Sequence, residues 1–239
     1  MKRRQRTGRL ITAIIVLIIS VVALIVQPEV HRSAAPSDTS EGIVNSPALI
    51  ALEKLAVKGR APKTGYERAL FGDGWASTLG CDTRDIILNR DMTNVKIDGE
   101  CEVLSGTLID PYTGKVIQFQ RGETTSDDVQ IDHVVALSDA WQTGAQQLTP
   151  ARREALSNDP LELLAVDGDA NQEKSDANAA SWLPPNLSFR CQYIARQIAV
   201  KLKYELWVIP AEKEAMQQIL SSCPDQPVPT ARTALQLLP

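Results

Sequence analysis

The stretch of sequence that decides the fold is Val129-Gln130-Ile131-Asp132-His133-Val134-Val135. Its β-branched and apolar residues favour a short strand, which ends at the polar pair Asp132-His133. The chain has one other histidine, His31, in a Pro- and Ser-rich stretch, so His133 is the sole imidazole of the part expected to fold. A histidine beside an acid is alone a weak functional signal, because a buried histidine with satisfied nitrogens is the commoner explanation.

The sequence that follows strengthens a functional interpretation. An apolar run at 161–166 predicts a buried strand, and the polar segment 167–176 is expected to lead into a short helix. Asp132 and Asn171 offer oxygen ligands of the kind that Mg²⁺ prefers, and His133 can accept a proton from water. These residues predict a minimal metal-assisted phosphodiesterase. The alternative for 167–176 is a solvated acidic turn.

Outward from this centre, short strands and helices alternate. Residues 103–119 predict a β-hairpin, because extended runs flank the turn Asp110-Pro111-Tyr112-Thr113-Gly114. A short amphipathic helix is expected from Pro47, with Gly59 as its stop. Further helices are predicted at 138–145, 150–157, 189–204 and 211–221. This order indicates an α+β fold with its strands clustered in the middle of the chain.

The composition favours one folded domain with accessory segments. The 239 residues are 44% hydrophobic and 23% charged, which excludes global disorder, collagen and a multi-span membrane protein. The net charge of −4 hides an asymmetry, because residues 1–32 hold six of the 25 basic residues and one of the 29 acidic ones. The acidic remainder argues against a protein that coats nucleic acid by bulk charge. Any contact with a polyanion would have to be local.

The N-terminus has the pattern of a membrane anchor. Five positive charges lie in residues 1–9, and residues 10–26 are apolar except for Thr12 and Ser20. This run reaches the lower limit of a spanning helix, roughly 17–25 residues. We predict a cytoplasmic segment at 1–9, a transmembrane anchor at 10–26 and a disordered tether at 27–46, with the rest outside the membrane. Secretion after signal cleavage is the alternative, and a buried core helix is a weaker one because the flank is so basic.

The cysteines agree with an exported domain. Cys81, Cys101, Cys191 and Cys223 all lie beyond the anchor, and none belongs to a C-x-x-C pair. Outside the cytosol we expect two disulfides, and proximity in sequence favours Cys81–Cys101 and Cys191–Cys223. Four buried free thiols are the alternative if the anchor interpretation is wrong.

Several motifs together resemble the HNH endonucleases of the ββα-metal type. They are Asp132-His133-Val134-Val135, Asn158-Asp159-Pro160 and Asn171-Gln172-x-Lys174-x-Asp176. The branch resembles the C-terminal domain of GmrSD-type modification-dependent restriction enzymes, which is also found as small exported actinobacterial proteins. The similarity runs from about Gly80 to Ser221. It implies an HNH ββα-metal core with a β-hairpin and flanking helices.

The resemblance implies a role for each matching residue. Asp132 and Asn171 would be the metal ligands, His133 the general base, and Asn158 the residue that positions the histidine through its loop. The third letter of the motif is Asn here, which favours a single Mg²⁺ or Mn²⁺ over Zn²⁺. Lys174 would face a phosphate, with a salt bridge as the equal alternative. Arg196 is expected to contact phosphate within a basic face at 190–203, and an ordinary solvated helix face is its alternative.

The sequence thus predicts an HNH endonuclease-like domain at 47–223 and a flexible tail at 224–239. Its expected activity is metal-dependent hydrolysis of phosphodiester bonds in DNA, at the cell membrane with the nuclease domain outside. RNA stays open, because no visible feature reads a 2′-hydroxyl. We expect the rate to rise with pH through the imidazole pKa, about 6.5 if unperturbed. The alternative is an exported, envelope-associated nucleic-acid-binding module without catalysis. No protein partner is identifiable.

Overall fold

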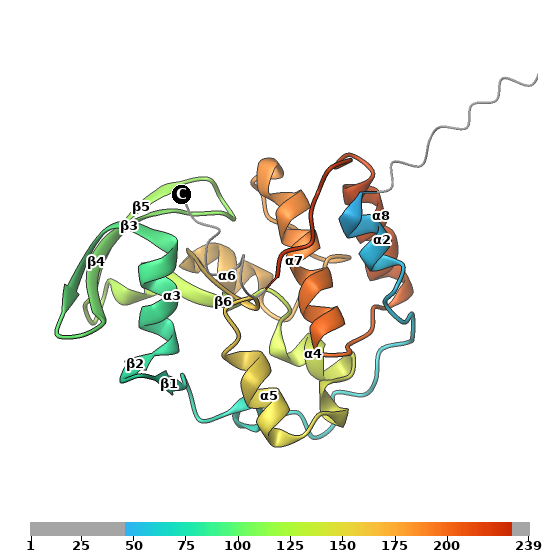
Figure 1. The fold of residues 1–239 in the computed structure, drawn as a ribbon, viewed down its shortest axis with the longest axis horizontal. Coiled ribbons are helices and arrows are strands. Elements are labelled where there is room, and N and C mark those ends of the chain that lie inside the picture. The colour runs from blue at the N-terminus through green and yellow to red at the C-terminus, as the bar shows by residue number, and fades with distance from the viewer. Residues whose placement is uncertain (1–45, 231–239) are drawn as a thin grey trace, which may run out of the picture. The chain divides into compact units, whose positions relative to one another are not determined.

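The computed structural model describes residues 46–230 (Figure 1). Three small antiparallel sheets and several helices make up this part of the chain, as the α+β prediction requires. The predicted anchor at 10–26 and almost all of the tether fall outside the described residues. Within residues 46–230, no helix has the length and apolar character needed to cross a bilayer.

The three-stranded sheet contains the predicted hairpin and one strand more. β4 (Glu102–Ile109) pairs with β5 (Val116–Gln120) across the expected turn, which confirms the hairpin. β3 (Met92–Asp98) pairs with the other edge of β4, and the strand order is β3-β4-β5. The sequence pattern missed β3 because the residues after Met92 are mostly exposed and polar and therefore show no apolar alternation.

A ββα unit lies at the centre of the described residues. β6 (Val129–His133) and β7 (Leu163–Asp167) pair antiparallel, and α6 (Gly168–Lys174) follows β7 directly. The helix therefore starts inside the segment expected to be a polar loop. The carboxylate of Asp167 accepts a hydrogen bond from the backbone N–H of Ala170 at 2.9 Å, which caps the helix where the strand ends.

β7 separates two apolar clusters. Leu163 and Ala165 face a cluster formed with α3 (Thr83–Asp91) and the three-stranded sheet, whereas Leu164 and Val166 face the larger helical core. All five residues of β7 are buried. This double burial explains why the strand is a continuous apolar run, since neither face meets water.

Along the chain, helices precede the ββα unit, lie between its two strands and follow it (Figure 1). The connection from β6 to β7 contains α4 (Leu137–Gln142), which ends before the predicted residue 145, and α5 (Pro150–Ser157), which has the predicted bounds. The predicted C-terminal helices are present as α7 (Arg190–Lys203) and α8 (Pro210–Leu220), and the N-terminal one, α2 (Pro47–Leu52), is shorter than expected. The remaining elements are β1 (Ser77–Thr78), β2 (Cys81–Asp82) and the short 3-10 turns η1 (Arg68–Phe71), η2 (Ser126–Asp128), η3 (Ala145–Gln147) and η4 (Leu187–Phe189).

Both predicted disulfides are present. Cys81 joins Cys101, which ties β2 to the residue before β4. Cys191 joins Cys223, which ties the start of α7 to the residues after α8. None of the described cysteines is free.

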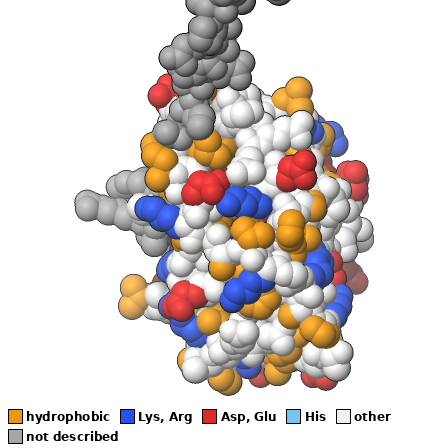
Figure 2. All heavy atoms as spheres, turned by 90° about the vertical axis from the view of Figure 1, so that its right-hand side faces the viewer, with side chains coloured by type: hydrophobic (Ala, Val, Ile, Leu, Met, Phe, Trp, Pro, Cys, Tyr) orange, Lys and Arg blue, Asp and Glu red, His pale blue; other side chains and the backbone are white. Residues whose placement is uncertain are grey.

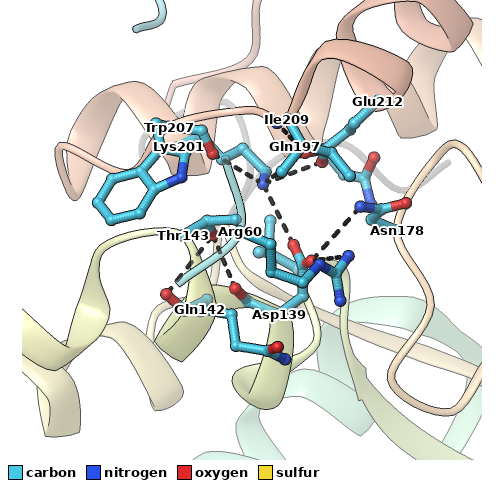
Figure 3. Close-up of polar contacts among 12 residues, drawn as sticks. Arg60, Asp139, Gln142, Thr143, Asn178, Gln197, Lys201, Trp207, Ile209 and Glu212 are labelled. Carbon is cyan, nitrogen blue, oxygen red and sulfur yellow. Dashed lines mark hydrogen bonds and ion pairs between the residues drawn. The ribbon is translucent and has the colours of Figure 1, made fainter. Parts of the chain in front are cut away.

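A buried ionic cluster links α4, α7 and α8 (Figure 3). The ammonium of Lys201 lies 3.2 Å from a carboxylate oxygen of Asp139 and 2.9 Å from one of Glu212, and all three side chains are almost fully buried. Arg60 reaches Asp139 from the surface at 3.0 Å. We call Lys201, Asp139 and Glu212 the Lys201 cluster.

The surface that Figure 2 shows carries interspersed charges. Basic and acidic side chains alternate on this face with apolar and neutral ones, and no large area of a single sign is visible. This face therefore offers a polyanion no broad area of a single positive sign.

Candidate active site

A polar pocket of about 360 Å³ opens where β6 ends and α6 runs past it. Asp132, His133 and Asn171 all line it, so the fold brings together three residues that are up to 39 positions apart in the sequence. The other lining residues are Tyr66, Arg68, Gln130, Ile131, Ala136, Leu137, Gln172, Ser175 and Asp176. We call this cavity the Asp132 pocket.

The imidazole of His133 is buried and held in one orientation. Its Nε2 lies 3.0 Å from the backbone carbonyl oxygen of Ser157, and its ring stacks on Trp75 with centroids 5.8 Å apart. A carbonyl oxygen only accepts, so Nε2 carries the proton in the neutral ring and Nδ1 keeps a free lone pair. That nitrogen is the one able to act as a base.

Burial lowers the pKa of His133 to about 3, and the nearby charges of Arg68 and Lys174 act in the same direction. The hydrogen bond to the Ser157 carbonyl opposes this shift. The imidazole is therefore neutral at physiological pH. This corrects the expectation of a titration near pH 6.5, which assumed an unperturbed ring.

Asp132 is buried beside the histidine, and both of its carboxylate oxygens already have partners. Tyr112 donates its hydroxyl to one oxygen, and the ammonium of Lys174 donates to the other at 2.9 Å. Lys174 also donates to the backbone carbonyl of His133 at 2.8 Å. Burial and the Asp132 charge raise the pKa of Tyr112 well above its usual value, so the phenol remains a donor.

Lys174 therefore adopts the salt bridge that was the alternative to a phosphate contact. Its side chain is about 1% exposed and lies behind Asp132, and it does not line the pocket. The ammonium holds the aspartate and the backbone of the histidine in place.

Asn171 faces the pocket from α6 and has a free oxygen. Its amide nitrogen donates to the side-chain oxygen of Gln130 at 2.8 Å, which leaves Oδ1 available. Gln130 lies two residues before Asp132 on β6, so the same strand provides the acid and orients the amide.

The donor set fits a hard cation better than a soft one. Asp132 keeps one lone-pair site on each carboxylate oxygen, and Asn171 adds an amide oxygen. Mg²⁺ and Mn²⁺ accept such a set with several retained waters. Within residues 46–230 there is no group of three or more His, Cys, Asp or Glu side chains placed to hold a metal ion together.

Asn158 lies outside the pocket and bridges two segments of the chain, one of which contacts His133. Its oxygen accepts a hydrogen bond from the backbone N–H of Ala76 at 2.8 Å, and its nitrogen donates to the Ser157 hydroxyl at 3.1 Å. Since the Ser157 carbonyl binds His133, Asn158 is placed to act on the histidine through this loop.

Arg196 does not offer its charge to a phosphate. Its guanidinium is buried and donates to the backbone carbonyls of Leu161, Pro160 and Leu163 at 2.7, 2.7 and 3.1 Å. Lys201 is buried as well, so neither Arg196 nor Lys201 contributes to the basic face expected on α7. The solvated-face alternative also fails for both residues, because their charges fix loops and helices inside the fold.

Four residues of the site carried no signal in the sequence analysis: Arg68, Trp75, Tyr112 and Gln130. Each comes from a segment that is distant in sequence or from a strand position without a distinctive pattern, and only tertiary packing brings it to His133 or Asp132. Tyr112 lay within the predicted hairpin turn, but a turn motif gives no indication that its phenol reaches an acid 20 residues later.

Comparison with known proteins identifies the family. Residues 82–219 match the family described as the C-terminal domain of GmrSD restriction endonucleases. A protein of Arthroderma benhamiae, named an uncharacterized secreted protein, is 39% identical over 198 residues, which cover 81% of this chain and 94% of the relative. No solved structure matches. The matched residues contain Asp132, His133, Asn158 and Asn171, and the chain therefore belongs to the family of the GmrSD restriction endonuclease C-terminal domain.

Proposed function

We propose that this protein is an HNH-type endonuclease that hydrolyses phosphodiester bonds with the help of a single Mg²⁺ or Mn²⁺ ion. Membership of a restriction endonuclease family indicates a nuclease and a nucleic-acid substrate. The observation that carries the finer proposal is the meeting of Asp132, His133 and Asn171 in one pocket, with a neutral imidazole among them.

Each residue has a distinct task in this proposal. His133 takes a proton from a water molecule at Nδ1, while the Ser157 carbonyl fixes the ring through Nε2. Asp132 and Asn171 hold the divalent ion, which when bound would stabilise negative charge on the phosphate oxygens. Lys174 and Tyr112 keep the Asp132 carboxylate in one orientation. We propose Asn158 as a positioning residue for the loop that holds His133.

A second function is favoured by one observation. Lys174 already neutralises Asp132, which weakens the attraction of the pocket for a cation. A binding module with the same fold and no catalysis would retain such an ion pair. The response of the protein to added metal separates the two functions.

We also propose that the protein acts outside the cell. The two disulfides and the name of the secreted relative support an exported domain. DNA remains the favoured substrate. Membrane anchoring through residues 10–26, the actinobacterial type and the HNH branch stay predictions.

Cleavage of supercoiled plasmid over a Mg²⁺ titration, with EDTA as the blank, tests the proposed function. His133→Ala should lower the rate by ~10²–10⁴-fold, because it removes general-base catalysis. Asp132→Ala should shift the metal requirement upward, and Asn171→Ala should do so less, because only the first ligand is charged. Lys96→Ala, an exposed residue of β3, serves as the control.

Two outcomes would overturn the proposal of metal-dependent cleavage with His133 as the base. One is nicking that is equally fast with and without metal and in His133→Ala. The other is binding of nucleic acid without any cleavage at saturating Mg²⁺ or Mn²⁺, which would establish the binding module instead.

A further inference from the structure

A second pocket lies against His133 and has a different lining. It measures about 210 Å³ and is bordered by Arg68, Phe71, Gly72, Gly74, Trp75, His133, Leu137 and Ser157. Arg68, His133 and Leu137 also line the Asp132 pocket, so the two cavities share this wall. Aromatic and apolar side chains dominate the second pocket, whereas polar ones dominate the first. We call it the Trp75 pocket.

The segment that builds this pocket precedes the family match. Residues 68–75 lie before position 82, where the matched part of the chain begins. Gly72 and Gly74 both have positive φ, at 111° and 105°, so the backbone turns along the edge of the pocket in a conformation that side-chain-bearing residues rarely adopt. The side chains that this segment places on the pocket are those of Arg68, Phe71 and Trp75.

Arg68 is a cation without a carboxylate partner. Its side chain is exposed, and its guanidinium has no hydrogen bond or ion pair with any other residue in the described part of the chain. It is also the one cation among the residues that line the two pockets. The two acids of these linings, Asp132 and Asp176, pair instead with Lys174 and Lys63.

Hydrogen bonds connect residues 68–75 to α5, which also contacts His133. The Ser157 hydroxyl donates to the carbonyl of Phe71 at 2.6 Å, while the Ser157 carbonyl binds His133. Arg153 donates to the carbonyl of Leu70 at 2.9 Å. Two residues of α5 therefore hold this segment, and one of them, Ser157, also contacts His133.

We propose that the Trp75 pocket binds one unstacked base of a single-stranded nucleic acid, with Arg68 on the adjoining phosphate. This proposal rests on the proposed function, because it supplies that site with its substrate. Base stacking on an aromatic side chain tolerates every base, and a guanidinium matches the geometry of a phosphate. The volume is below the ~300–1,000 Å³ of pockets that enclose whole drug-sized ligands, which suits one ring system.

The arrangement selects single strands over duplexes for a physical reason. A base in a duplex is stacked and paired, and moving it into a side pocket costs unstacking free energy that an already unpaired base does not require. A substrate seated by one base and one phosphate places the next phosphodiester along the shared wall, where His133 faces the Asp132 pocket. Single-stranded DNA or RNA should therefore be bound and cut in preference to duplex DNA.

Binding measured in EDTA tests the pocket apart from catalysis. The probes are a fluorescent 12-nucleotide single-stranded DNA, the same sequence as RNA and the same sequence as a DNA duplex, each read by anisotropy. Trp75→Ala should weaken binding to the DNA and RNA single strands roughly tenfold and leave duplex binding nearly unchanged, because only the stacking contact is lost. Trp75→Phe should retain most of the affinity.

Arg68→Ala should weaken the binding of all three probes. It should also reduce the slope of log affinity against log salt concentration by about the amount expected for one phosphate contact. Lys96→Ala should have neither effect. Equal affinity of the wild type for single strand and duplex, together with no selective effect of Trp75→Ala, overturns the base pocket. Plasmid cleavage would then still stand as the test of nuclease function. Selective loss in Trp75→Ala without any cleavage by the wild type supports the pocket and rejects the nuclease.

Discussion

Two lysines are buried in the part of the chain that the structure describes, and they differ in what lies next to them. Lys174 pairs with Asp132 at 2.9 Å, and Lys201 pairs with Asp139 at 3.2 Å, each with almost no exposure. Asp132 lines an open pocket beside His133. Asp139 lines neither described pocket, and its cluster holds a second carboxylate, Glu212, against the same lysine.

The comparison shows that a buried ion pair does not by itself indicate a functional site. Both pairs join helices or strands that are distant in sequence, and both neutralise a carboxylate in a medium of low polarity. The difference is access, because only Asp132 has an accessible face and a basic nitrogen beside it. We infer that the Lys201 cluster is structural, whereas Lys174 orients a group that acts on the substrate.

The largest expected effect is on stability, from Lys201→Met. Removal of the ammonium leaves two buried carboxylates facing each other, and breaking a buried pair from one side costs about 3–5 kcal/mol. Denaturant unfolding followed by tryptophan fluorescence measures the loss. Lys213→Met is the matched control, because its pair with Glu53 is partly exposed and should contribute at most about 1 kcal/mol. Equal losses for the two variants would remove the structural role of the cluster.

Lys174→Met should destabilise less and affect function more. The variant loses the contacts of Lys174 with Asp132 and with the His133 carbonyl, but Asp132 keeps the hydroxyl of Tyr112 and lines an open pocket, so the cost should be about 1–3 kcal/mol. The freed carboxylate should attract Mg²⁺ more strongly, so half-maximal nicking should need less metal even if the maximal rate falls. A metal titration of plasmid cleavage reads both quantities. An unchanged metal requirement would mean that Asp132 is not a ligand.

The sequence predicted the elements whose apolar residues follow a simple period. The hairpin, β6, β7 and the helices α4, α5, α7 and α8 carry such patterns, whereas β3 does not, because its outer residues are exposed and polar. α6 was expected to begin later, since its acidic sequence looks like a loop until the cap at Asp167 is known. The core of the site could be predicted because Asp132 and His133 are adjacent and Asn171 follows at a motif spacing.

The rest of the site depends on partners that the sequence does not display. In the sequence, Lys201 and Arg196 look like part of a basic helix face. In the structure, Lys201 donates to Asp139, 62 residues earlier, and Arg196 donates to backbone carbonyls near β7. Arg68 and Trp75 lie more than 50 residues before His133 and have no motif of their own. Their roles follow from packing against α5.

Acid should destabilise the folded protein through His133, which lies beside Asp132 in the pocket. The unfolded chain binds a proton on this imidazole below pH ~6.5, but the folded protein does so only near pH 3, because burial lowers the pKa of His133 to about 3. The stabilisation of the folded state is fully present above pH 6.5 and is lost as the pH falls toward 3. Between pH 8 and pH 5 the free energy of unfolding should fall by about 2 kcal/mol. Unfolding of wild type and His133→Gln in EDTA over this range isolates the contribution. Parallel curves for the two proteins would contradict a depressed pKa.

The smallest expected effect comes from Arg60→Met and tests which cation holds the structural cluster. Arg60 reaches Asp139 at 3.0 Å, but about a third of its side chain is exposed, so water screens the pair. Asp139 would keep Lys201 at 3.2 Å and the amide of Asn178 at 3.5 Å, and the loss should be at most about 1 kcal/mol. Lys63→Met, which breaks an exposed pair with Asp176, gives the reference for a surface contact. A loss in Arg60→Met as large as that in Lys201→Met would show that the cluster depends on its surface cation. The two buried lysines would then differ in more than the accessibility of their aspartates. Lys174 would still be the cation that holds Asp132, whereas Asp139 would depend on the partly exposed Arg60.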